Sequence, residues 1–150
     1  MKIDLVMVNI YRGTSFKDLF NDWKKKTHLS KIPLVVAEFG RSSKSGTGKD
    51  TSFNQSNTIR KLWKEINSNK NTVGAGGFIF ELNDEAWKGK QEYSSLIGSE
   101  ANLGLFTVKY NTPKKDAKLA AKTVAKLWGV KLWCFFLKKH FLFNTLYIGS

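Results

Sequence analysis

Short apolar runs alternate along the chain with longer segments whose apolar residues recur every three or four positions. Three of the runs are rich in residues that favour strands and are apolar on both sides, which is typical of buried strands. They cover residues 4–11, 34–39 and 74–82. We therefore predict three buried strands in one parallel sheet, with the segments between them crossing over it as helices.

The connecting segments predict three helices. The first follows Ser15, whose side chain we expect to cap it, and its buried stripe is Phe16, Leu19, Phe20 and Trp23. The second covers about residues 54–67, with an inner face made of Ile59, Leu62, Trp63 and Ile66. After a short strand-like segment at 102–108, the third covers 114–128 and buries Ala117, Ala121, Val124 and Trp128. The Gly- and Ser-rich residues 40–50 predict an exposed loop.

Polar residues gather where the three predicted strands end. They are Asn9 and Tyr11 on the first strand, Glu38 on the second, and Glu81, Asn83, Asp84 and Glu85 on the third. A doubly wound sheet and a barrel both collect their functional groups at this edge, so the pattern fits either architecture. Burying a carboxylate such as Glu38 is costly unless it is paired or used in chemistry. An ion pair with Arg12 or Arg41 is the structural alternative to a catalytic role.

Length limits the architecture. A chain of 150 residues forms about one domain, whereas a complete (β/α)8 barrel needs about 250 residues. The 41% hydrophobic and 13% aromatic content is that of a globular protein. The one cysteine, Cys134, excludes a disulfide within the chain and leaves the redox compartment open. His28 and His140 have no partner at metal-ligand spacing, so we expect no metal site and no cofactor.

The net charge of +13 raises the question of nucleic-acid binding. Residues 1–108 hold 16 basic and 11 acidic residues, whereas residues 109–150 hold nine lysines and one aspartate. Only three of the basic residues are arginine, although readers of bases and phosphates favour its bidentate fork. We therefore expect a lysine-rich solvated surface and no nucleic-acid partner.

Residues 131–150 differ in character from the rest of the chain. They are crowded with Phe and Leu, but Lys138, Lys139 and His140 interrupt them, so the apolar run is shorter than the roughly 20 residues that span a bilayer. A membrane span is therefore not favoured. We treat residues 1–130 as the folded unit and residues 131–150 as a tail of unclear status, which we expect to add nothing to the core.

The three strands resemble consecutive strands of retaining glycoside hydrolases of clan A, which are TIM barrels. Residues 33–40 (PLVVAEFG) resemble the seventh barrel strand, which carries the nucleophile before an aromatic residue and a glycine. Asp4, Asn9 and Tyr11 fit the sixth strand, and residues 76–81 (GGFIFE) fit the eighth. Residues 102–105 (NLGL) resemble the segment that follows. The likeness covers about residues 3–128 and is nearest to the β-galactosidase and β-glucuronidase family and to β-1,3-glucanosyltransferases.

The resemblance implies an α/β fold, the C-terminal part of a (β/α)8 barrel, that contains the last three strand–helix units. It makes Glu38 the catalytic nucleophile and Tyr11 the residue that donates a hydrogen bond to it. Asn9, Glu81, Asp84 and Trp87 would bind the sugar, with Trp87 stacking on a pyranose face. The general acid/base of these families ends the fourth strand, which would lie before this chain. The resemblance also implies a secreted or extracytoplasmic protein.

Three functions stay open at this stage. The first is hydrolysis of O-glycosidic bonds in a polysaccharide or oligosaccharide by a retaining double displacement, or transglycosylation of a glucan through the same covalent intermediate. The second is carbohydrate binding by a non-catalytic remnant. The third is a basic interaction module built on the lysine-rich C-terminal third. The expected partner is a carbohydrate, and the sequence leaves the oligomeric state open.

Overall fold

The computed structural model describes residues 2–26, 28–88, 92–94, 98–108, 115–132 and 145–147. Its main feature is a four-stranded sheet in the order β1-β2-β3-β8. The strands β1 (Val6–Asn9), β2 (Leu34–Phe39) and β3 (Gly74–Phe80) are parallel, and β8 (Thr145–Tyr147) is antiparallel to β3. The order of strands and helices is therefore the predicted α/β arrangement with parallel strands, compatible with part of a barrel.

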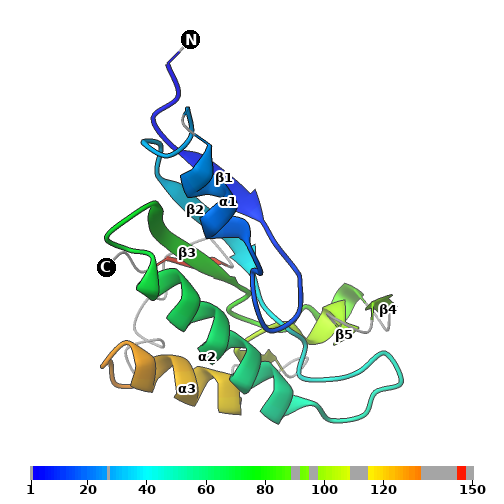
Figure 1. Cartoon of the computed structure of the whole chain (residues 1–150). Coiled ribbons are helices and arrows are strands. Elements are labelled where there is room, and N and C mark those ends of the chain that lie inside the picture. The colour runs from blue at the N-terminus through cyan, green and yellow to red at the C-terminus, as the bar shows by residue number, and fades with distance from the viewer. Residues whose placement is uncertain are drawn as a thin grey trace.

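Three helices accompany the sheet. Helices α1 (Leu19–Lys25) and α2 (Ser52–Ser68) lie over one face of it, and α3 (Leu119–Leu127) runs beside α2 (Figure 1). The Trp63 and Trp128 rings meet edge to face at a centroid distance of 5.1 Å, and the hydroxyls of Ser56 and Thr123 are hydrogen-bonded at 2.7 Å. Apolar and polar contacts therefore both join α3 to α2.

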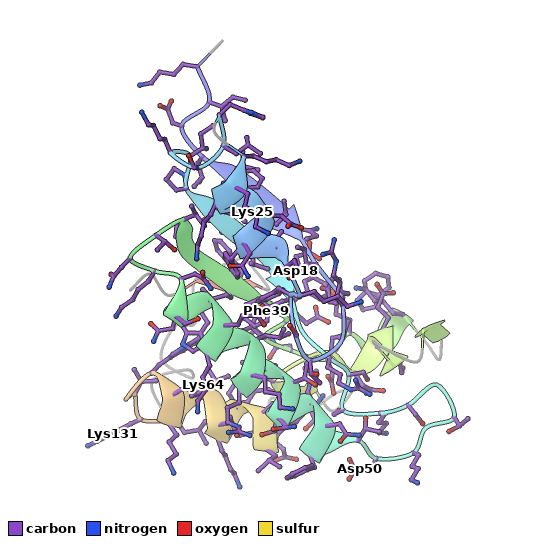
Figure 2. The ribbon with its side chains drawn as sticks, viewed as in Figure 1. Asp18, Lys25, Phe39, Asp50, Lys64 and Lys131 are labelled. Carbon is purple, nitrogen blue, oxygen red and sulfur yellow. The ribbon has the colours of Figure 1, made fainter. Side chains whose placement is uncertain are left out.

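Aromatic and aliphatic side chains between the helices and the sheet form the core. The Phe16 ring makes edge-to-face contacts with both Phe20 and Phe39, at centroid distances of 5.9 and 5.8 Å. Most of the predicted helical stripes are buried there: Phe16, Phe20, Ile59, Leu62, Ile66, Ala121 and Val124. Basic side chains such as Lys25 on α1 and Lys64 on α2 are exposed (Figure 2), as expected of a solvated surface.

The first strand differs from its prediction. It forms only over Val6–Asn9, and half-buried and exposed residues alternate along it, with Met7 50% exposed. Within the described residues β1 pairs with β2 alone, so it is an edge strand with little to cover its second face. Complete burial of residues 4–11 was therefore a wrong prediction, because an apolar pattern does not show whether a neighbouring strand is present.

Two helix boundaries also differ. Ser15 does not cap α1, whose N-cap position is Asp18; the Ser15 hydroxyl instead accepts a hydrogen bond from the Lys17 backbone nitrogen. The third helix begins at Leu119, because Lys115–Ala117 form strand β7 and pair antiparallel with β6 (Phe106–Val108). The pairing of β7 with β6 is a tertiary preference that helical spacing in the sequence does not report.

The remaining elements are short and lie in the loops that follow the sheet strands. They are the two 3₁₀ turns η1 (Ala86–Lys88) and η2 (Glu100–Asn102) and the hairpin of β4 (Glu92–Ser94) and β5 (Gly98–Ser99). The predicted loop at 40–50 is exposed over residues 47–50, half-buried at Ser45 and Gly46, and buried at Ser42 and Ser43. Part of the tail has a place in the sheet, since β8 pairs with Phe78, Ile79 and Phe80. Our expectation that the tail adds nothing to the core stays a prediction, and residues 133–144 and 148–150 lie outside the described part.

Candidate active site

Glu38 stands at the carboxyl end of β2, where the strand bulges. Val36 pairs with Val8 and Gly77, but the next matched positions are Asn9 opposite Glu38 and Ile79 opposite Phe39. β2 therefore contains one residue more than either neighbour at this point. A bulge of this kind changes the direction of the side chains that follow it and is common next to functional sites. The Ile10 nitrogen donates a hydrogen bond of 2.9 Å to the Glu38 carbonyl and so fixes the backbone there.

The side chain of Tyr11 meets Glu38 at this edge of the sheet. The Tyr11 hydroxyl donates a hydrogen bond of 3.2 Å to Oε2 of Glu38. Burial, followed by the nearby Glu38 carboxylate, raises the pKa of Tyr11 well above its ordinary value, so the hydroxyl keeps its proton. Within the described residues no ion pair joins Glu38 to Arg12 or Arg41. The carboxylate is therefore held by a neutral donor and stays half-buried.

Gly40 is required immediately after this strand. A Cβ added at Gly40 would overlap the Phe80 carbonyl oxygen, so β3 approaches the backbone of residue 40 too closely for any other side chain. Gly77 allows a second close contact, because its Cβ would lie 2.8 Å from Cδ1 of Ile66 and 3.1 Å from Cε1 of Phe39. The glycines of the two strand motifs thus let β2, β3 and α2 pack closely together.

A group of charged residues follows β3. Lys88 forms an ion pair with Glu85, and its Nζ lies 3.7 Å from Oε1 of Glu100. Burial disfavours the charged amine, but the hydrogen bond to Glu85 and the carboxylates of Glu81, Glu85 and Glu100 outweigh it and raise the pKa of Lys88. Lys88 Nζ also lies over the rings of Phe80 and Trp87, at 5.2 and 5.5 Å from their centroids. Lys88 therefore links the charged group to the exposed aromatic residue beside it.

Asp84 faces a different partner. Its Oδ1 accepts a hydrogen bond of 2.5 Å from Lys118 Nζ, and the two side chains are only 6% and 7% exposed. Lys118 also donates to the Ser43 hydroxyl at 2.9 Å and to the Asn102 carbonyl at 3.2 Å. Burial raises the pKa of the Asp84 carboxyl and lowers that of the Lys118 amine, and the attraction between them opposes both shifts. This pair joins the start of α3 to the loops after β2 and β3.

The structure thus separates the predicted site residues into groups. Tyr11 and Glu38 are in direct contact, and Asn9 is exposed beside them in register. Glu81 is 1% exposed, whereas Trp87 is 72% exposed. Asp84 is committed to Lys118. Sequence reasoning missed Lys88, Glu100 and Lys118, because their partners become neighbours only when the loops after β2 and β3 fold together.

The fold of this chain resembles that of a solved structure. No protein-family model matches the chain, and no curated protein matches it. A β-glucosidase from Exiguobacterium marinum superposes on 76% of this chain with a TM-score of 0.53 and 17% sequence identity. The chain covers 25% of that structure, so it spans about a quarter of its length. At this identity the match shows the fold alone: the chain shares part of the α/β architecture of that structure.

The described residues also lack two kinds of feature. They contain no group of three or more His, Cys, Asp or Glu side chains placed to bind a metal ion. None of the helices in the described ranges has the length and apolar character needed to cross a bilayer. What these residues offer is carboxylates, a tyrosine and an exposed indole at the carboxyl end of a parallel sheet.

Proposed function

We propose that this chain carries the nucleophile of a retaining glycoside hydrolase and that Glu38 is that nucleophile. The observation that supports this most strongly is the hydrogen bond from Tyr11 to Glu38 at the carboxyl end of a parallel sheet. Parallel α/β barrels collect their catalytic groups at this edge. The superposition on a β-glucosidase supports the fold on which this role depends.

The geometry assigns a distinct task to each of the two residues. Oε2 of Glu38 accepts the Tyr11 hydrogen bond, which fixes the plane of the carboxylate. A carboxylate oxygen of Glu38 attacks the anomeric carbon and forms a glycosyl ester while the bond to the leaving oxygen breaks. Water, or a sugar hydroxyl in a transglycosylase, then breaks the ester and restores Glu38.

A retaining enzyme also needs a general acid about 5–5.5 Å from the nucleophile. Glu81 is a poor candidate, because a carboxyl group that is 1% exposed cannot reach a leaving group. In our proposal the acid belongs to a strand that precedes this chain in a longer protein. By itself the 150-residue chain then holds one of the two carboxyl groups and does not hydrolyse glycosides.

Trp87 and Asn9 provide the sugar contacts in this proposal. The Trp87 side chain is 72% exposed next to Lys88, so its indole face is available to stack on the apolar face of a pyranose. Asn9 is exposed and opposite Glu38 in the sheet register. The buried ion pair with Lys118 gives Asp84 a supporting role, in which it holds the loop that leads to Trp87.

One observation also favours a second function, carbohydrate binding without catalysis. The described residues offer an exposed aromatic platform at Trp87, whereas Glu81, the carboxyl group that ends the next strand, is buried. A chain that works alone would then bind a glycan and leave its bonds intact. Retention of oligosaccharide by the isolated chain, with no turnover by the longer protein, would favour this function over the first.

Chemical rescue tests the nucleophile assignment in the longer protein. Changing Glu38 to Ala should abolish turnover of an activated aryl glycoside, and added azide should restore release of the aryl group. Azide occupies the space of the lost carboxylate, attacks the anomeric carbon and leaves a glycosyl azide of inverted configuration. The control is Asp22→Asn, which neutralises an exposed carboxylate on α1 and should keep full activity without azide. Failure of azide to restore turnover, or a product of retained configuration, would reject Glu38 as the nucleophile.

A further inference from the structure

Glu81 is a buried acid whose hydrogen-bonding needs the fold leaves open. It follows β3 directly and is 1% exposed. Neither Oε1 nor Oε2 receives a hydrogen bond from any donor in the described part of the chain. A buried, ionised carboxylate without donors is strongly disfavoured, whereas a neutral carboxylic acid needs only an acceptor for its proton.

An acceptor for that proton is present. The side chain of Glu85 lies within hydrogen-bonding reach of Glu81. Two ionised carboxylates can only accept, so a hydrogen bond between them requires that one of them carry a proton. Glu85 is itself paired with Lys88, so the geometry places the cation on Glu85 and the proton on Glu81.

The other titratable groups around Glu81 come from five parts of the fold. Lys88 lies on η1 and attracts the ionised form of Glu81, and Asp84 on the preceding loop opposes it. Lys118, at the N-cap of α3, and Tyr11, after β1, are both close enough to Glu81 to feel its charge. Glu100 on η2 faces Lys88 and Tyr11. Lys88, the cation that acts on Glu81, is already shared by Glu85 and Glu100, and no ion pair to Glu81 is present in the described part of the chain.

We propose that Glu81 and Glu85 form a carboxyl pair that holds one proton between them at neutral pH and thereby positions Lys88 beside Trp87. In this arrangement Glu81 donates to Glu85, Glu85 holds Lys88, and Lys88 lies over the Trp87 ring. Glu81 acts through its neighbours and is a positioning residue. The assignment goes beyond glycoside chemistry, because it concerns the protonation of the fold itself and holds whichever ligand the site takes.

The direction of the electrostatics agrees with this geometry. Burial, followed by the charge of Glu85 and the hydrogen bond to it, raises the pKa of Glu81 to about 8. The pair then loses its shared proton as the pH rises through that value, and two anions compete for Lys88. Since the folded protein holds this proton more tightly than the unfolded chain, its contribution to stability is complete at acidic pH and is lost by about pH 8.

A titration of the whole 150-residue chain tests the proposal. The side-chain carboxyl carbons of glutamate would be followed by carbon-detected NMR from pH 4 to 10 in the wild type, in Glu81→Gln and in Asp22→Asn. We expect one glutamate in the wild type to titrate with a midpoint near 8, and the same midpoint in Asp22→Asn. The transition should vanish in Glu81→Gln, whose amide mimics the protonated acid. The indole resonance of Trp87 should shift with the same midpoint in the wild type.

Each failure has a clear meaning. If no glutamate of the wild type titrates above pH 6, the proposal that Glu81 and Glu85 share a proton is wrong. This outcome is measured on the wild type alone, so it does not depend on whether a variant folds. A midpoint near 8 that persists in Glu81→Gln would assign the proton to another residue. A Trp87 resonance that does not follow the transition would overturn the positioning of Lys88. None of these outcomes bears on whether Glu38 is a nucleophile, so the two proposals can fail separately.

Discussion

Tyr11 and Glu38 are 27 positions apart in the chain, and the Tyr11 hydroxyl donates a hydrogen bond of 3.2 Å to the Glu38 carboxylate. Parallel pairing of β1 with β2 brings them together, and the bulge before Glu38 adjusts the direction of its side chain. Burial keeps the tyrosine protonated, so it serves as a donor across the whole working range of pH.

Removal of that hydroxyl should lower activity more than stability. A hydrogen bond to a charged group contributes about 1.5–3 kcal/mol, so Tyr11→Phe should reduce kcat in the longer protein by about 10–100-fold. The unfolding free energy should change by no more than about 1–2 kcal/mol. A double-mutant cycle provides the control, since Tyr11→Phe should cost nothing further in a Glu38→Gln background. Equal losses in both backgrounds would show that Tyr11 does not act through Glu38.

Gly40 should not tolerate a side chain. In Gly40→Ala the new Cβ would collide with the Phe80 carbonyl oxygen, and overpacking against backbone should cost about 3 kcal/mol or more. The comparison is Gly48→Ala, at a site with φ of 82° and nothing within 4 Å, where only backbone strain of about 1–2 kcal/mol is expected. Urea unfolding of both variants measures the difference. Equal destabilisation would mean that β3 yields easily at Phe80.

The buried pair of Asp84 and Lys118 should be sensitive to loss of one partner. Lys118→Met leaves the Asp84 carboxylate buried without its cation and should destabilise the fold by about 3–5 kcal/mol. Adding Asp84→Asn should recover part of that loss, because the uncompensated charge is removed. The exposed pair of Lys2 and Asp4 is the control, and Asp4→Asn should change stability by less than about 1 kcal/mol. Urea midpoints that fall further in the double variant would contradict this account.

Trp87 should contribute to binding and little to stability. Its side chain is 72% exposed, so Trp87→Ala should weaken oligosaccharide binding while unfolding changes by less than about 0.5 kcal/mol. Phe53 on α2 offers a matched control, since it is 73% exposed and Phe53→Ala should leave binding unchanged. Titration calorimetry with short glucan oligosaccharides measures both. Equal effects of the two substitutions would indicate non-specific adsorption to aromatic surface.

The sequence predicted individual strands and helices better than it predicted which strands and side chains contact one another. The apolar run at 34–39 became β2 with the predicted bounds, because its residues are buried by neighbours on both sides. The run at 4–11 looked equally apolar, yet its strand is short and exposed, since burial depends on a neighbour that the pattern does not encode. The meeting of Lys118 with Asp84 across 34 positions likewise depends on the folded loops.

The candidate site shows the same difference between local motifs and tertiary contacts. The motif around Glu38 predicted a hydrogen bond from Tyr11, which the structure contains, whereas the role of Glu38 as a nucleophile stays a prediction. Strand register and burial, which no spacing in the sequence reveals, produce the bulge in β2, the sharing of Lys88 by Glu85 and Glu100, and the burial of Glu81 without a hydrogen-bond donor.

The most direct test of the central claim is covalent labelling of the nucleophile. A 2-deoxy-2-fluoro glycoside with an activated leaving group would be incubated with the longer protein, and its peptides would be mapped by mass spectrometry. The fluorine slows hydrolysis of the glycosyl ester, so the labelled carboxylate accumulates. Our account predicts one sugar attached to the peptide that contains Glu38 and no label in Glu38→Gln. A sugar attached to Glu81 or to any other carboxylate would contradict it.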